Sequence, residues 1–228
     1  LIFNVSKTVK IILLVLGVLL IDQVLKIYIK TNFQYGEDMP LFGANWAYFN
    51  FVENNGMAFG LSLRGEYGKL ALSLFRIVAV VFLWIYIQRL IKQNAHFGLL
   101  VSFGLIFAGA VGNIIDSTFY GLIFSESFYH GGLAQMFPPG GGYAGLLHGK
   151  VVDMLYFPII DTHFPSWFPF WGGQRFEFFK PVFNIADASI STGVGILLVF
   201  YNKFFKEEPK TQSEDTLNTA ETKTENQE

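Results

Sequence analysis

The sequence predicts an all-α membrane protein with four transmembrane helices, a small β-rich element outside the membrane and a long loop between the third and fourth helices. Hydrophobic residues make up 52% of the 228-residue chain and charged residues only 15%. A soluble domain of this size needs more charge to cover its surface. Four stretches are also apolar over about 20 residues, the length that crosses about 30 Å of hydrocarbon.

The four apolar stretches have different compositions. Residues 6–29 have the centre IILLVLGVLLI, and residues 70–91 contain VAVVFLWIYI. Residues 97–116 carry several glycines and alanines, which allow close helix packing in lipid, and residues 184–205 form the fourth stretch. The first stretch does not read as a secretory signal, because polar residues from Asp22 to Lys26 stand where a small-residue cleavage site is needed.

Basic residues indicate the orientation of the chain in the membrane. The positive-inside rule places Lys/Arg-rich ends in the cytoplasm. Lysines and arginines gather where the first stretch begins, between the second and third stretches and after the fourth: Lys7, Lys10, Arg89, Lys92, Lys203 and Lys206. We therefore expect both termini in the cytoplasm, a membrane domain over residues 1–205 and a disordered cytoplasmic tail over residues 206–228, which are polar almost throughout.

The two outward loops differ in kind. Residues 31–69 contain an alternating stretch at 46–52, which predicts a small strand-rich element on the membrane. The loop 117–183 includes an insertion at about 122–180 that is rich in Gly, Pro and aromatic residues. Within it, residues 164–179 read FPSWFPFWGGQRFEFF, which suits either an aromatic surface at the membrane interface or packing onto the protein's own helices. We expect the insertion to cover the functional site or to rest on the membrane surface.

Composition also excludes several kinds of chemistry. The chain has no cysteine, so thiolate metal sites and cysteine nucleophiles are absent. Its net charge is −2, and no stretch dense in Lys and Arg alternates with aromatics, which argues against nucleic-acid binding.

Polar residues inside the spans collect at one depth. Ionisable groups in a membrane are costly, so each is a candidate functional residue. In the predicted topology all of them lie toward the outer leaflet: Asp22 and Lys26 in the first span, Arg76 in the second, Asn113 and Asp116 in the third, and Asn184 and Asp187 in the fourth. Asp22 and Lys26 are four residues apart, so a structural ion pair is the expected role for them.

Asp153 and Asp187 are harder to explain by structure alone. Two carboxylates in a poorly hydrated site cannot both ionise cheaply, so one proton is shared between them. Such a pair supplies a base that activates water and an acid that protonates a leaving amine, without metal or cofactor. The plainer interpretation is that Asp187 caps a helix and Asp153 binds within a loop.

The motifs around these residues resemble those of one family, the lipoprotein (type II) signal peptidases of prokaryotes. Five segments occur in the family order: Asp22-Gln23 with Lys26, Asn54-Asn55-Gly56-Met57-Ala58-Phe59, Gly112-Asn113 with Asp116, Val151-Val152-Asp153, and Phe183-Asn184-Ile185-Ala186-Asp187. The resemblance covers residues 8–205, except most of 122–149 and 155–180.

The resemblance implies a membrane-embedded aspartic endopeptidase of the inner membrane. It would remove signal peptides from diacylglyceryl-modified prolipoproteins, cutting just before the lipidated cysteine at the outer leaflet. Asp153 and Asp187 correspond to the catalytic pair. Substrate binding or support of the site falls to Asn54, Gly56, Asn113, Asp116, Asn184, Asp22, Lys26 and Arg76. No cofactor or metal is implied, the expected partners are prolipoprotein signal peptides and membrane lipids, globomycin-type inhibitors should bind, and a monomer is expected.

One position departs from the family pattern. The family usually has Arg after the Asp of its third motif, where Ser117 stands here. An Arg there would neutralise Asp116 or hold a neighbouring loop, and Arg76 and Arg175 are the candidates to replace it.

Other motifs favour different functions less strongly. Residues 145–150 read GLLHGK, which lacks the first Gly and the final Ser or Thr of a phosphate loop. His130, His148 and His163 lack metal-site spacing. A serine protease using Ser125 or Ser127 with Lys150 is one alternative, and a transporter or scaffold with an ion path through Asp22, Asp116 and Asp187 is another. The inner halves of the first two spans lack the polar groups that a path across the membrane requires.

Overall fold

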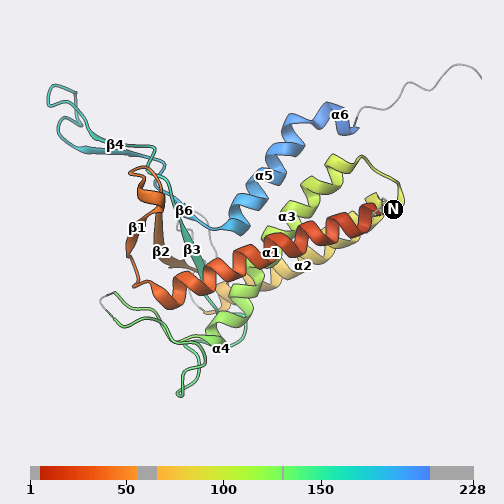
Figure 1. Cartoon of the computed structure of the whole chain (residues 1–228), viewed down its shortest axis with the longest axis horizontal. Helices are drawn as coiled ribbons and strands as arrows, with labels where there is room; N and C mark the ends of the chain where they lie inside the picture. The colour runs from red at the N-terminus through yellow and green to blue at the C-terminus, as the bar shows by residue number, and fades with distance from the viewer. Residues whose placement is uncertain (1–5, 56–65, 130, 206–228) are drawn as a thin grey trace, which may run out of the picture.

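The computed structural model describes residues 6–55, 66–129 and 131–205, and consists of a helical bundle with β-structure at one end (Figure 1). Gly56 and the tail 206–228 lie outside the described residues. In chain order the elements are α1 (Lys7–Asn32), β1 (Asp38–Pro40), the short helix η1 (Leu41–Gly43), β2 (Tyr48–Asn54), α2 (Glu66–Lys92), α3 (Phe97–Ile115), the π-helical turn η3 (Asp116–Tyr120), α4 (Gly121–Ile123), β3 (Val151–Tyr156), β4 (Ile160–His163), β5 (Arg175–Phe178), β6 (Val182–Phe183), α5 (Ile185–Val199) and α6 (Tyr201–Phe205).

In the part of the chain that the structure describes, three helical segments are long and apolar enough to cross a membrane: Lys7–Asn32, Gly68–Lys92 and Phe97–Ile123. The fourth predicted span, residues 184–205, is not a single long helix. Asn184 caps α5, which has 15 residues and ends at Val199; the backbone leaves helical geometry at Phe200, before α6. At 1.5 Å per residue, α5 rises only about 22 Å, so the count of four full spans is not confirmed.

The third span extends beyond its predicted end at Asp116. The helical path continues through the π-helical turn η3 and through α4 to Ile123. A π-helical turn holds an extra residue, and such turns are frequent at functional sites. The turn begins at Asp116, one of the candidate site residues.

Small residues bring α5 against the middle of the bundle. α3 packs against α1, α2 and α5. A Cβ atom on Gly109 of α3 would lie 2.2 Å from the Ala186 carbonyl oxygen, and one on Gly193 of α5 would lie 2.6 Å from the Ser102 carbonyl oxygen. Only glycine permits this approach, which confirms the expected close packing of the third span.

A four-stranded antiparallel sheet closes one end of the bundle, with the strand order β1-β2-β3-β6 (Figure 1). The strand-rich element predicted for residues 31–69 is therefore only half of the sheet. β3 and β6 come from the loop 117–183, so the all-α prediction missed the strand that carries Asp153. The pairing of β2 with β3 brings together residues that are distant in the sequence: Val52 lies opposite Asp153, and Asn54 lies opposite Val151.

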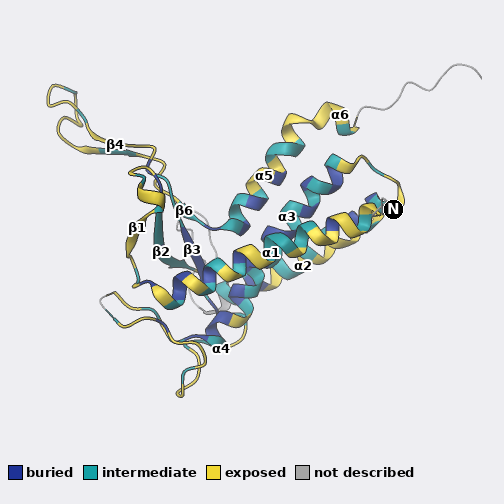
Figure 2. Cartoon of the chain, viewed as in Figure 1, coloured by how far each residue is buried: buried dark blue, intermediate teal, exposed yellow. Residues whose placement is uncertain are grey.

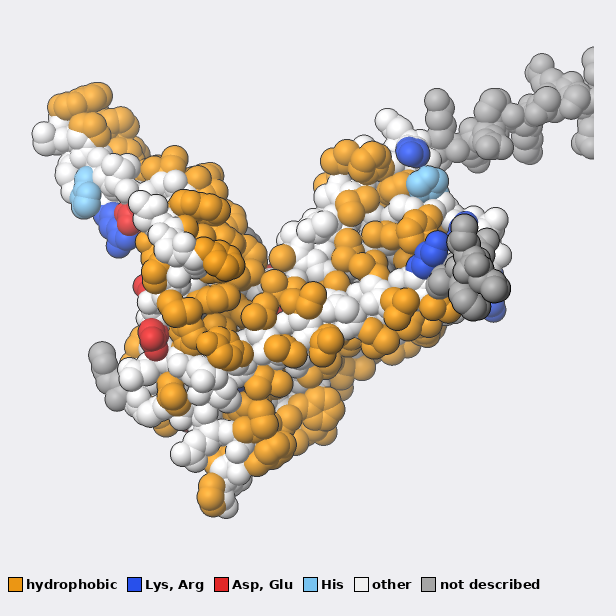
Figure 3. Space-filling model, in the orientation of Figure 1, with side chains coloured by type: hydrophobic (Ala, Val, Ile, Leu, Met, Phe, Trp, Pro, Cys, Tyr) orange, Lys and Arg blue, Asp and Glu red, His pale blue; other side chains and the backbone are white. Residues whose placement is uncertain are grey.

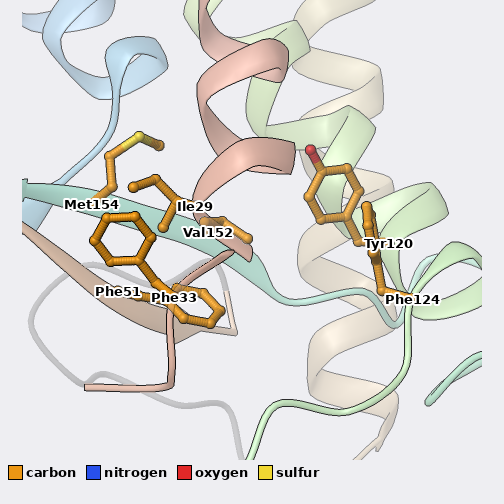
Figure 4. Packing of buried hydrophobic residues seen from close by; sticks show 7 residues of the cluster. All are labelled: Ile29, Phe33, Phe51, Tyr120, Phe124, Val152 and Met154. Carbon is orange, nitrogen blue, oxygen red and sulfur yellow. The ribbon is translucent and has the colours of Figure 1, made fainter. Parts of the chain in front are cut away.

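The main core lies where α1, η3, α4 and the sheet meet (Figure 4). Its buried side chains are Ile29, Phe33, Phe51, Tyr120, Phe124, Val152 and Met154. Away from this core, much of the helix surface is apolar and exposed, as in Leu20, Phe75 and Phe82 (Figure 2). Such a surface suits lipid and would be unfavourable in water.

The aromatic segment 164–179 forms the tip and second strand of the hairpin β4–β5, which is a separate two-stranded sheet. This hairpin projects away from the helices (Figure 1). Its rings pack on one another: Phe164 stacks on Phe168 and packs against Phe176 at a tilted angle. The interpretation that the segment packs onto the protein's own helices is therefore wrong.

Candidate active site

Asp153 is held on the central strand β3, on the face opposite the main core. Side chains alternate along a strand, so Val152 and Met154 point into the core while Asp153 points toward the helices. Only 4% of Asp153 is exposed. Asn54, at the end of the neighbouring strand β2, donates a hydrogen bond from Nδ2 to Asp153 Oδ2.

Asp187 is held in the first turn of α5. The Asn184 side chain caps this helix, since its Oδ1 accepts a hydrogen bond of 2.8 Å from the Asp187 backbone N–H. Asn113 of α3 donates from Nδ2 to Asp187 Oδ1 at 2.8 Å. Asp187 is half-buried, more open than Asp153. A carboxylate in the first turn is favoured by the helix dipole.

Two asparagines connect the two carboxyl groups. Asn184 Nδ2 lies 2.7 Å from Asp153 Oδ1 and 3.2 Å from Asn113 Oδ1. Since Asn113 in turn donates to Asp187, a chain of side-chain contacts runs from one carboxyl group to the other. The structure thus brings together four residues from β3, α3 and the start of α5.

Burial is the main influence on the ionisation of Asp153. It raises the pKa of Asp153 to about 7, and the negative charge of nearby Asp187 acts in the same direction, while the hydrogen bonds from Asn54 and Asn184 oppose the rise. A carboxyl group of this kind keeps a proton near neutral pH. It can then serve as an acid beside a carboxylate that serves as a base.

A buried lysine organises the helices beneath this pair. Lys26 Nζ lies 2.8 Å from Asp22 Oδ2, 2.9 Å from Asp116 Oδ2 and 3.0 Å from Asn113 Oδ1. The Asp22–Lys26 ion pair expected from their spacing therefore forms, and Asp116 joins it. All three charged side chains are fully buried.

The two carboxylates of this cluster also bind backbone groups beside the catalytic candidates. Asp22 Oδ1 accepts from the Ala186 N–H at 2.8 Å, next to Asp187. Asp116 Oδ2 accepts from the Val152 N–H at 3.3 Å, next to Asp153. The cluster thereby ties β3 and α5 to the same point between α1 and α3.

The remaining predicted residues have different places. Arg76 of α2 lies within electrostatic range of Asp187. Arg175 lies on the hairpin, where it forms an ion pair with Asp161. The cation that neutralises Asp116 is Lys26, so the suggestion that Arg175 takes this part is wrong.

Two further side chains support the site and were not among the predicted site residues. Gln23 donates to Asp116 Oδ1 at 2.9 Å and accepts from the Tyr120 hydroxyl. Lys30 is fully buried, forms an ion pair with Glu53 and donates to Ser127 Oγ at 2.9 Å. Its position four residues after Lys26 extends the polar face of α1, a signal that the sequence contained.

The groups proposed for other chemistry do not assemble. Lys150 pairs with Glu126, and Ser125 Oγ accepts from the Gln135 N–H. Ser127 contacts Lys30, not Lys150. His130 lies outside the described residues, and among those described no group of three His, Asp or Glu side chains could hold a metal ion.

Comparison with known proteins matches most of the chain to one family. The sequence model of the family described as signal peptidase (SPase) II matches residues 14–203. The chain belongs to the type II signal peptidase family. This membership makes it a protease of lipoprotein processing, and its apolar helices fit a multi-pass protein of the bacterial inner membrane. The family also favours a peptidase over the transporter or scaffold.

Individual relatives of the type II signal peptidase family agree with this result. A lipoprotein signal peptidase of Porphyromonas gingivalis is 52% identical over 189 residues, which is 82% of this chain and 80% of the relative. One from Amoebophilus asiaticus is 36% identical over 182 residues, covering 78% of this chain and 72% of the relative. Two solved structures of bacterial membrane enzymes share the fold: both are 23% identical, with TM-scores of 0.55 and 0.53, and cover 89% and 87% of this chain and 94% of each of theirs.

Proposed function

We propose that this peptidase is an aspartic endopeptidase that cleaves diacylglyceryl-modified prolipoproteins just before the lipidated cysteine. Asp153 and Asp187 are its catalytic residues. The observation that carries the proposal is the chain of contacts from Asp153 through Asn184 and Asn113 to Asp187. It sets two carboxyl groups of unequal burial beside each other at the sheet end of the bundle.

The two carboxyl groups divide the proton transfers between them. At rest the deeper Asp153 holds the proton and Asp187 is ionised. Asp187 takes a proton from water as the water oxygen attacks the scissile carbonyl carbon, and Asp153 protonates the carbonyl oxygen. When the tetrahedral intermediate collapses, the diol returns a proton to Asp153 and Asp187 protonates the leaving amine. Both residues are then in their starting states.

The neighbouring residues hold this geometry. Asn54, Asn113 and Asn184 orient the carboxyl groups, and Asn184 also fixes the first turn of α5. Lys26 with Asp22 and Asp116 anchors β3 and α5 from below, and Arg76 lies near Asp187. Gly56, which falls on a family motif, completes the predicted set. We assign the membrane domain to residues 1–205 and no cofactor to the reaction.

The substrate approaches from the membrane. Its lipid chains and signal helix remain in the bilayer while the scissile bond reaches the carboxyl pair at the outer leaflet. Globomycin-type inhibitors should compete for this position, and a single copy of the chain contains all the proposed site residues.

The test is cleavage of a diacylglyceryl-modified prolipoprotein peptide by the purified wild type and by the variants Asp153→Asn and Asp187→Asn. We expect the wild type to cut before the modified cysteine and each variant to lose at least about a thousandfold of activity, because each lacks one of the two proton-transfer groups. Asp161→Asn, which changes an exposed carboxylate on the hairpin, is the matched control and should remain active. Near-normal turnover by a folded Asp153→Asn or Asp187→Asn variant would refute the proposed pair.

A further inference from the structure

The hairpin β4–β5 has one apolar and one charged face. Paired residues of antiparallel strands point to the same side, and successive pairs alternate. The pairs Ile160 with Phe178 and Thr162 with Phe176 therefore share one face, whereas Asp161 with Glu177 and His163 with Arg175 share the other. The Arg175–Asp161 ion pair lies on the second face.

The tip of the hairpin carries uncharged aromatic residues into the open. Residues 164–174 contain no charged side chain. Trp167 is 77% exposed, Phe170 93% and Trp171 54%. The tip has a defined shape, because the Gly173 N–H donates to the Phe164 carbonyl at 3.0 Å and the Phe164 ring stacks on Phe168. These residues are held outward by an ordered scaffold.

The position of the hairpin directs its apolar face toward the membrane. The hairpin begins and ends at the sheet, between β3 and β6, and extends sideways beyond the ends of the helices (Figure 1). In the space-filling view, charged side chains lie on the side of this arm turned away from the helices, and hydrophobic ones cover the side turned toward them (Figure 3). With the helices in lipid, that hydrophobic side faces the membrane surface.

We propose that the hairpin is a membrane-surface anchor that binds phospholipid at the sheet end of the bundle. Trp and other aromatic residues prefer the boundary between lipid headgroups and acyl chains. The apolar face continues the lipid-exposed surface of the helices, and its charged opposite face stays in water. The occupant is the leaflet in which the protein itself is embedded, not a second protein.

Anchoring would act on the sheet that carries the site. In the chain the hairpin lies between β3, which carries Asp153, and β6, which leads into α5 and Asp187. A contact with the membrane surface at the hairpin therefore fixes the tilt of the sheet relative to the bilayer. This role concerns where the protein sits and does not depend on the proposed catalytic pair.

The test places a fluorescent probe on each face of one strand. The chain has four Trp, which are replaced by Phe, and Thr162→Trp or His163→Trp is then introduced. Each protein is reconstituted into phosphatidylcholine vesicles with or without bromine atoms on the acyl chains near the glycerol. Bromine quenches Trp only at short range. A variant that retains only Trp84 of α2, which is exposed on the helix surface, calibrates full lipid contact.

We expect brominated lipid to quench Trp at position 162 at least twofold and to leave Trp at position 163 nearly unchanged. No quenching at position 162 would overturn the proposal and favour a protein partner for this face. Equal quenching at both positions would overturn the two-faced orientation. Neither result would bear on cleavage by the wild type, so failure here is distinguishable from failure of the proposed function.

Discussion

Asp153 and Asp187 carry the same functional group but lie in different surroundings. Asp153 is buried on a strand and is reached by two asparagine side chains, whereas Asp187 is half-buried at a helix N-terminus. Burial opposes charge at the first position, and the helix dipole favours it at the second. In the proposed mechanism, this difference is the reason why the two carboxyl groups take opposite proton-transfer roles.

The pH dependence of cleavage should report this pair. Loss of the shared proton ends activity, so we expect kcat/KM to fall as the pH rises past about 7, the value to which the pKa of Asp153 is raised. Asn54 stabilises the charged form of Asp153 and thereby lowers the pKa. In Asn54→Ala, the fall of kcat/KM on the alkaline side of the pH profile should therefore occur at a pH higher by about one unit. This shift is the equivalent of one lost hydrogen bond to a charged group.

A control for this shift lies on the same strand. Asn50 donates to Asp38 at the other end of β2, so Asn50→Ala should leave the limb in place. The measurement is the profile of kcat/KM against pH for the wild type, Asn54→Ala and Asn50→Ala. A limb that moves to lower pH in Asn54→Ala would contradict the assigned direction.

Among the helices, the ion cluster around Lys26 joins α1 to α3. Removal of Lys26 leaves two buried carboxylates uncompensated, which costs about 3–5 kcal/mol for a buried pair. We expect Lys26→Met to lower the midpoint of thermal unfolding in detergent by about 10 °C. Lys150→Met is the matched control, because the Lys150–Glu126 pair is partly exposed and contributes at most about 1 kcal/mol. Similar midpoints for the two variants would disprove the structural role of the cluster.

The contact between α3 and α5 depends on particular glycines. A Cβ on Gly193 would meet the Ser102 backbone at 2.6 Å, whereas one on Gly195 would meet nothing within 4 Å. Gly193→Ala should therefore force the helices apart and destabilise the protein by about 1–3 kcal/mol. Gly195→Ala should be neutral or slightly stabilising, because alanine favours the helix by about 1 kcal/mol. Thermal unfolding of the two variants tests this prediction. An equal loss of stability in both variants would argue against close packing at Gly193.

At the scale of the whole molecule, the sequence predicted the helices better than the sheet. Long apolar stretches mark α1, α2 and α3 through composition alone, and the polar residues of these spans do converge beside the sheet. The pairing of β2 with β3 joins residues about 100 positions apart, and such short strands carry little local signal. Asp153 was therefore expected in a loop, although it lies on the central strand.

The fourth predicted span is not one continuous helix, for a related reason. Residues 196–201, which surround the break, read ILLVFY and are all hydrophobic, so their composition cannot reveal the break at Phe200. Lys30 lies just beyond the end predicted for the first span, yet the helix continues to Asn32 and the core encloses this side chain. Family motifs identified Asp22, Asn113 and Asp187, but only the fold shows which groups touch.

The arrangement of charge over the molecule predicts its orientation. At the end opposite the sheet, α1 begins with Lys7 and Lys10, and Lys7 donates to Asn94 in the α2–α3 connection at 2.7 Å. Arg89, Lys92 and Lys203 occupy the last turns of α2 and α6. From the positive-inside rule we propose that this end faces the cytoplasm and that the sheet with the carboxyl pair faces outward.

Two glutamine positions test this orientation directly. The chain has no cysteine, so single cysteines report without background. Gln34→Cys lies just after α1 at the sheet end, and Gln93→Cys lies just after α2 at the basic end, both exposed. A membrane-impermeant maleimide should label Gln34→Cys in intact spheroplasts and Gln93→Cys only after lysis. The reverse pattern would show the opposite orientation in the membrane. The carboxyl pair would then face the leaflet that prolipoprotein cleavage does not use.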